Sequence, residues 1–150
     1  MWYKETIESI LKKAIDKEKD AYTVYKEVAD NTKNEKVKTA LNALAEKEQK
    51  HIQVIENFDI KMSKKQEIEI NETSRQWIAE YLISTEEKLG NDSEFKDVFM
   101  YAAKREKKSF EFYSFMSKFV DDPKLKKLFS WLAQEESKHE KDLIWDLMYH

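Results

Sequence analysis

Residues 44–51 read LAEKEQKH and residues 132–139 read LAQEESKH, and these two stretches decide the fold. In both stretches a Glu and a His stand three positions apart: Glu48 with His51, and Glu136 with His139. Apolar residues recur around them at alternating spacings of 4 and 3, which predicts one face of a long α-helix. Because the Glu and His occupy positions of that apolar face, we expect their side chains to point into the core.

The same spacing predicts four long helices. The four patterns run from Ile7 to Val28, from Val37 to Phe58, from Phe95 to Met116 and from Leu125 to Leu143. Only a few residues separate the first two patterns, and only a few separate the last two. Short connections of this kind join antiparallel neighbours, so we expect two helical hairpins, over residues 4–58 and 94–148.

Residues that favour helix ends support these boundaries. Asn34 is expected to cap the second long helix. Asp122, which precedes the only proline, is expected to cap the fourth. Gly90 is expected to end a shorter helix, after which Asp92 or Ser93 starts the third long one. One Gly and one Pro leave too few turn-forming residues for an all-β fold.

The connection between the hairpins, residues 59–93, is unusually long for a compact domain. It is expected to contain a short amphipathic helix whose apolar face is formed by Trp77, Ile78, Tyr81 and Leu82. A connection of this length can run back along a bundle. The sequence therefore predicts an all-α fold, an antiparallel four-helix bundle with one long crossover, in a single domain over residues 1–150.

The two hairpins are related by an internal repeat. A shift of 88 positions superposes residues 14–55 on residues 102–143 without a gap, and 11 of the 42 pairs are identical. Glu18 then meets Glu106, and both residues of each Glu-x-x-His pair meet their counterparts. The ungapped register favours duplication of one hairpin over chance similarity between helices.

Composition excludes several classes of function. The formal net charge is −3, so no surplus of basic residues is available to bind the phosphates of a nucleic acid. The chain contains no Cys, which excludes disulfides, thiolate metal sites and Cys nucleophiles. We find neither a signal-peptide pattern at the start nor an apolar run of 18 residues. We therefore expect a cytoplasmic protein that binds neither a membrane nor nucleic acid.

The apolar faces of the four helices carry ionisable residues near their midpoints: Glu18, Glu48, His51, Glu106, Glu136 and His139. In an antiparallel bundle these midpoints meet at one level. Two like charges about 4 Å apart repel by roughly 4 kcal/mol at an effective dielectric of about 20, so four clustered carboxylates need compensation. Two divalent cations would balance them, and carboxylate with imidazole suits iron or manganese. The alternative is that the Glu-x-x-His pairs lie on the surface of Glu-rich helices.

These segments resemble a known family. AIDKEKDAYTVY (14–25) with LAEKEQKH, and AAKREKKSFEFY (102–113) with LAQEESKH, are similar to the two halves of the rubrerythrin-like branch of the ferritin-like superfamily. The resemblance implies a ferritin-like bundle with two iron ions on the six residues named above, Glu48 and Glu136 being placed to bridge the metals or to bind closely to one. It also implies reduction of hydrogen peroxide, or oxidation of ferrous iron by oxygen.

Two departures from the family pattern bear on function. Typical rubrerythrins have a further Glu three residues after the third-helix ligand, where this chain has Ser109, and Ala21 at the duplicate position. Typical members also carry a rubredoxin domain with four Cys, so the resemblance implies a separate electron donor protein for this chain. It further suggests a homodimer.

Tyr25 and Tyr113 lie seven residues after Glu18 and Glu106, on the same faces. We expect them to hydrogen-bond to metal-bound carboxylates, the alternative being that they only fill the core.

Three functions follow from the sequence. The favoured one is a di-iron redox enzyme of peroxide or oxygen defence. The others are an iron-sequestering protein with slow ferroxidase activity, and a metal-free helical interaction module.

Overall fold

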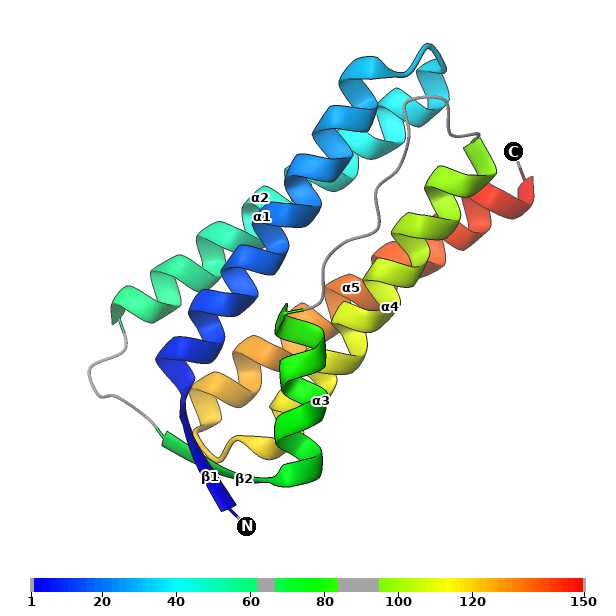
Figure 1. The fold of residues 1–150 in the computed structure, drawn as a ribbon. Helices are drawn as coiled ribbons and strands as arrows, with labels where there is room; N and C mark the ends of the chain where they lie inside the picture. Colours follow the sequence, from blue (N-terminus) through cyan, green and yellow to red (C-terminus); the bar gives the residue numbers. More distant parts are fainter. Residues whose placement is uncertain (1, 62–66, 84–94, 150) are drawn as a thin grey trace. The chain divides into compact units, whose positions relative to one another are not determined.

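The computed structural model describes residues 2–61, 67–83 and 95–149 (Figure 1). The elements, in chain order, are β1 (Trp2–Thr6), α1 (Ile7–Asn31), α2 (Glu35–Lys61), β2 (Glu67–Asn71), α3 (Glu72–Ile83), α4 (Phe95–Phe119) and α5 (Pro123–Tyr149). The four long helices predicted from the apolar spacing are therefore confirmed, as is the short helix within the crossover. Among the described residues, no helix is long and apolar enough to cross a membrane.

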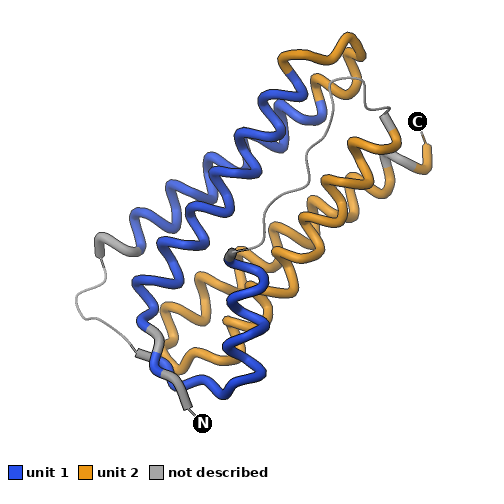
Figure 2. Tube along the Cα trace, in the orientation of Figure 1, with its two compact units in different colours: residues 1–29, 40–88 blue, residues 30–39, 89–150 orange. Residues whose placement is uncertain are grey.

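The chain is divided into two compact units (Figure 2). Unit 1 comprises residues 1–29 and 40–88, and holds β1, β2, α3 and most of α1 and α2. Unit 2 comprises residues 30–39 and 89–150, and holds α4 and α5 together with the connection from α1 to α2.

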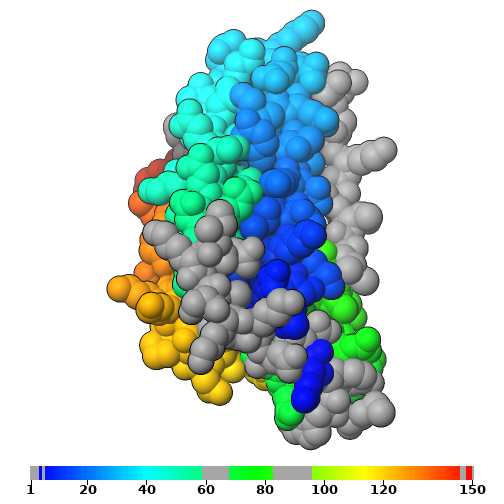
Figure 3. All heavy atoms as spheres, turned by 90° about the vertical axis from the view of Figure 1, so that its left-hand side faces the viewer, coloured from blue at the N-terminus to red at the C-terminus, as the bar shows by residue number. Residues whose placement is uncertain are grey.

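In unit 1, α1 and α2 form the predicted antiparallel hairpin. Lys26 Nζ donates a hydrogen bond to Asn42 Oδ1 at 3.0 Å, and Lys19 Nζ lies 3.9 Å from Glu56 Oε1. Lys19 precedes Lys26 in α1, whereas its partner Glu56 follows Asn42 in α2. The two helices therefore run in opposite directions. Figure 3 shows the two helices side by side along one face of this unit. The core residues between them follow the predicted apolar faces, among them Leu11, Ala14, Ala21, Leu41 and Ile55, all fully buried.

In unit 2, α4 and α5 form the second antiparallel hairpin. Lys126 Nζ donates a hydrogen bond to the Ser117 carbonyl oxygen at 3.4 Å, close to the turn between the helices. Further along, the rings of Tyr113 and Phe129 stack with centroids 6.2 Å apart. The buried apolar side chains that fill this hairpin include Phe99, Phe112, Met116, Leu125 and Leu132.

Both predicted caps of the long helices are in place. Asn34 Oδ1 accepts hydrogen bonds from the backbone N–H groups of Lys36 and Val37, at 3.0 and 3.2 Å. Asp122 Oδ2 accepts one from the backbone N–H of Leu125 at 3.0 Å. Each side-chain oxygen thereby satisfies N–H groups that have no partner within the helix. Gly90, Asp92 and Ser93, which were expected to mark the boundary before α4, lie outside the described residues.

Two more caps and a small sheet were not expected from the sequence. β1 and β2 pair antiparallel, from Trp2 opposite Asn71 to Thr6 opposite Glu67. Each strand leads directly into a helix and ends on its cap: Thr6 Oγ1 accepts a hydrogen bond from the Ser9 N–H, and Asn71 Oδ1 accepts one from the Ser74 N–H. The start of the predicted crossover is thus partly a strand.

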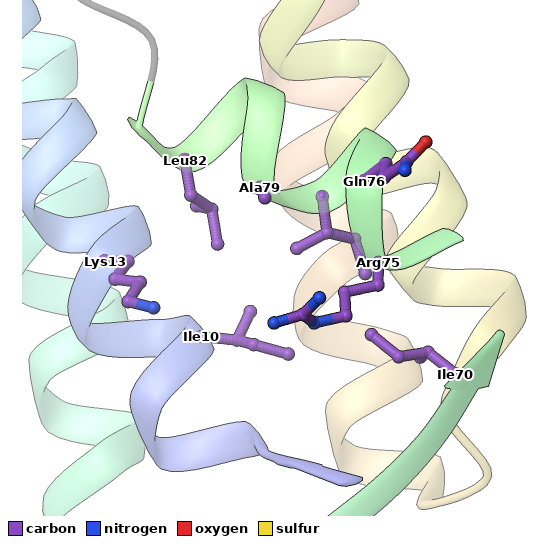
Figure 4. A pocket seen from close by; sticks show the side chains of 8 residues that line it. Ile10, Lys13, Ile70, Arg75, Gln76, Ala79 and Leu82 are labelled. Atoms are coloured by element: carbon purple, nitrogen blue, oxygen red, sulfur yellow. The ribbon is translucent and has the colours of Figure 1, made fainter. Parts of the chain in front are cut away.

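A hollow of about 240 Å³ lies in unit 1 between α1, β2 and α3 (Figure 4). Aliphatic side chains such as Ile10, Ile70 and Leu82 line most of it, and Lys13 and Arg75 point toward one another across it. Its lining includes neither a carboxylate nor an imidazole. Its chemistry therefore differs from that of the residues predicted to bind metal.

Candidate metal centre

Unit 1 brings three of the predicted ligands together. We call Glu18 of α1 and Glu48 and His51 of α2 the unit-1 cluster. Because Glu48 and His51 are three residues apart on one helix, they share a face, and α1 presents Glu18 to that face. His51 Nδ1 lies 3.8 Å from Glu18 Oε2 and 4.0 Å from Glu48 Oε2. One ligand atom from each residue lies within 4.8 Å of the other two, so all three residues could bind the same metal ion.

Unit 2 repeats this arrangement with Glu106 of α4 and Glu136 and His139 of α5, which we call the unit-2 cluster. His139 Nδ1 lies 3.5 Å from Glu106 Oε2. Again one ligand atom from each of the three residues lies within 4.8 Å of the others. The internal repeat of the sequence is therefore also a repeat of the local geometry.

All six residues are buried. The exposed fraction is 0% for the four glutamates and for His51, and 2% for His139. The alternative that the Glu-x-x-His pairs lie on the surface is therefore wrong. Burying carboxylates away from water is costly unless cations or hydrogen bonds compensate them, so four carboxylates buried together with two imidazoles require a physical reason.

Glu106 is held in its ionised form. Burial by itself raises the pKa of this carboxyl group. The neighbouring Glu136 and His139 side chains and the positive charge of Arg105 outweigh that effect, and lower the pKa from 4.5 to about 2. An anionic carboxylate in the core is the form that a metal ion binds.

A buried cationic residue directly precedes the first glutamate of each cluster in the chain, and the sequence analysis did not identify either one. Lys17 precedes Glu18 and Arg105 precedes Glu106, and both side chains are only 5% exposed. Arg105 Nη1 lies 3.5 Å from Glu106 Oε1. Lys17 Nζ lies 5.1 Å from the centre of the Tyr81 ring, which belongs to α3. The 88-residue shift aligns these two cations and could have found them.

The remaining predicted residues lie in the core. Tyr25 and Tyr113 are fully buried, and Ser109, one turn after Glu106, is 1% exposed. The Tyr113 ring packs edge-on against Phe112 and stacks on Phe129, so it does fill the core. Hydrogen bonding of either tyrosine to a metal-bound carboxylate stays a prediction.

The donor set of each cluster fits iron or manganese. Two carboxylates and one imidazole are available in each, with no thiolate, and two carboxylates balance the charge of one divalent cation when the imidazole is neutral. Paired Glu-x-x-His helices joined by single Glu residues from two other helices are typical of ferritin-like di-iron carboxylate proteins.

Comparison with known families gives the same class. The Rubrerythrin family model matches residues 9–144, which include both clusters, and the chain therefore belongs to the rubrerythrin family. Its fold is accordingly the ferritin-like helical bundle of that family, as the sequence predicts, and membership supports a di-iron protein. A search of curated proteins finds no match.

Proposed function

We propose that this protein is a non-haem di-iron redox enzyme that reduces hydrogen peroxide, with one iron ion on the unit-1 cluster and one on the unit-2 cluster. The observation that carries this proposal is the burial of two like clusters, each with two carboxylates and one imidazole. Membership in the rubrerythrin family supports iron as the metal.

The residues of the two clusters would hold two ferrous ions, whose two electrons, with two protons, would convert one H₂O₂ into two waters. The protein contributes the positions of the ligands. The Glu-x-x-His spacing fixes a carboxylate and an imidazole on one helix face, and the partner helix adds the second carboxylate. Ala14 and Leu132, each one helical turn before a cluster glutamate, are fully buried, and such apolar neighbours would limit the access of bulk water to the clusters. Because the chain has no Cys, we propose that a separate donor protein returns the electrons.

A single-turnover experiment tests this function. The iron-loaded, anaerobically reduced protein is mixed with H₂O₂ or with O₂, and the near-ultraviolet absorption of ferric iron is followed. We expect fast oxidation by peroxide and slow oxidation by oxygen. Equal or faster reaction with oxygen would contradict a peroxidase. The exposed variant Glu56→Gln, which leaves both clusters intact, serves as the control.

A second candidate function is iron sequestration with slow ferroxidase activity. The observation that favours it is Ser109, a buried residue that offers a hydroxyl where typical family members offer a carboxylate. Retention of iron in large excess over the two clusters would support this function. Absence of iron from protein purified and reloaded anaerobically would instead favour the metal-free helical module.

A further inference from the structure

The residues that line the hollow of unit 1 belong to neither metal cluster. The hollow has a volume of about 240 Å³, below the roughly 300–1000 Å³ of sites that enclose drug-sized ligands. A water-sized group occupies about 30 Å³, so this volume has room for about eight non-hydrogen atoms. Three elements that lie far apart in the chain, α1, β2 and α3, form its walls (Figure 4). The space therefore fits a small ligand.

The inner surface of the hollow is aliphatic. Ile10, Ile70 and Ile78 are 2%, 0% and 5% exposed, and Ala79 and Leu82, which complete this surface, are half-buried. None of the eight described residues that line the hollow is aromatic, so no ring is available for a planar ligand to stack on. An alkyl chain gains from burial against such side chains and has no polar group to desolvate.

Two cationic side chains lie where the hollow meets solvent. Lys13 of α1 and Arg75 of α3 are exposed, and they point toward one another across the hollow (Figure 4). Among the described residues that line it, these two carry positive charge and none carries negative charge. An anion between the two cations is attracted by both. A guanidinium offers five N–H donors in a planar fork that matches a carboxylate, so Arg75 can bind one and keep its other contacts.

We propose that this hollow binds a small aliphatic monocarboxylate of about six carbons. Its alkyl chain would lie against the three isoleucines, and its carboxylate would lie between Lys13 and Arg75. Hexanoate has eight non-hydrogen atoms, which matches the volume. Inorganic phosphate would leave the aliphatic surface uncovered, and an alkylammonium ion would meet two like charges. The inference goes beyond the proposed function and does not depend on it, because no lining residue is a predicted metal ligand.

Titration calorimetry with straight-chain carboxylates of increasing length tests the proposal on the protein as purified. The affinity should rise by about fourfold for each added CH₂ up to about six carbons, and should level off in longer chains because the hollow is then filled. Hexylamine and hexan-1-ol should each bind at least about threefold more weakly than hexanoate. Acetate that binds as tightly as hexanoate would overturn the proposal, as would an affinity that keeps rising to ten carbons.

Variants of the lining residues test whether this hollow is the site. Ala79→Leu fills part of the hollow and keeps both charges, so it should weaken hexanoate binding by about tenfold or more. Lys13→Met and Arg75→Met should each weaken it by about two- to fivefold, as expected for exposed ion pairs. Lys12→Met is the matched control, because Lys12 is exposed beside Lys13 but does not line the hollow. Equal effects of Lys12→Met and Lys13→Met would contradict the site.

The outcomes separate this inference from the proposed function. Ala79→Leu should retain as much iron as wild-type protein while it loses hexanoate binding. A protein that binds hexanoate but no iron would refute the proposed function alone, and one that binds iron but not hexanoate would refute the inference alone. If circular dichroism shows that Ala79→Leu does not fold, the chain-length series and the two charge variants still decide the question.

Discussion

At the scale of the residue, the position of Glu48 on its helix decides whether its side chain is buried. It is fully buried, whereas Glu46, two residues earlier on α2, is exposed. The two residues have the same chemistry and differ in the face they occupy. Only the apolar spacing around them tells the two apart, and that spacing is readable in the sequence.

Replacing Glu48 by Gln should remove metal from the unit-1 cluster, because the neutral amide is a poor ligand for a hard cation and one charge is lost. Iron content after anaerobic loading measures the effect. Glu46→Gln is the matched control and should retain wild-type iron. If the two variants retain equal iron, Glu48 is not a ligand.

Replacing Ser109 by Glu should give the unit-2 cluster the further carboxylate that typical rubrerythrins have. Burying this carboxylate without metal costs several kcal/mol, so the metal-free variant should melt at a lower temperature than wild-type protein. Loading with iron should restore much of that loss and speed single-turnover oxidation by peroxide. Ser109→Ala is the control, and equal rates for the two variants would refute a role for this position.

The contacts of the Arg105 and Lys17 side chains could not be predicted from the sequence. Their positions are visible in the repeat, but the partner of each depends on the conformation of its long side chain. The sequence does not indicate that Lys17 reaches Tyr81, more than 60 residues away, or that Arg105 stays beside Glu106. Contacts of this kind are decided by tertiary packing.

At the scale of the element, the helices were readable because each long apolar pattern offers many matches to one period. The starts of two of these helices could be predicted from their capping residues, Asn34 and Asp122. The strands β1 and β2 could not be predicted. Each has five residues, too few for a periodic signal, and each finds its partner about 65 positions away in the chain. The caps at Thr6 and Asn71 depend on those strands and were missed with them.

Removing the N-terminal cap of α5 tests how much this cap contributes to the stability of the protein. Asp122→Ala should destabilise the protein by about 1 kcal/mol, because the Leu125 N–H loses its acceptor and the negative charge leaves the helix N-terminus. Urea unfolding of the metal-free protein measures this change. Asp121→Ala, which removes an exposed neighbour, should have a much smaller effect. Equal losses would mean that charge alone, and not the cap, stabilises the start of α5.

At the scale of the whole molecule, duplication explains why two hairpins with about a quarter of their residues in common carry equivalent clusters. The repeat and the family could be predicted from the sequence, because both follow from residues at fixed spacings. The contacts of the two aligned cations could not, because the Lys17 side chain lies beside the Tyr81 ring of α3 and the Arg105 side chain beside Glu106, and long side chains such as these are placed by tertiary packing.

Anaerobic titration with Fe²⁺ tests the central claim most directly, with the iron retained per chain after desalting as the readout. Wild-type protein should retain about two ions, and His51→Ala and His139→Ala about one each, because each removes one of the two clusters. Circular dichroism confirms that both variants keep their helices. Wild-type protein that retains no iron, or variants that retain as much as wild-type protein, would show that the buried glutamates and histidines are not an iron site.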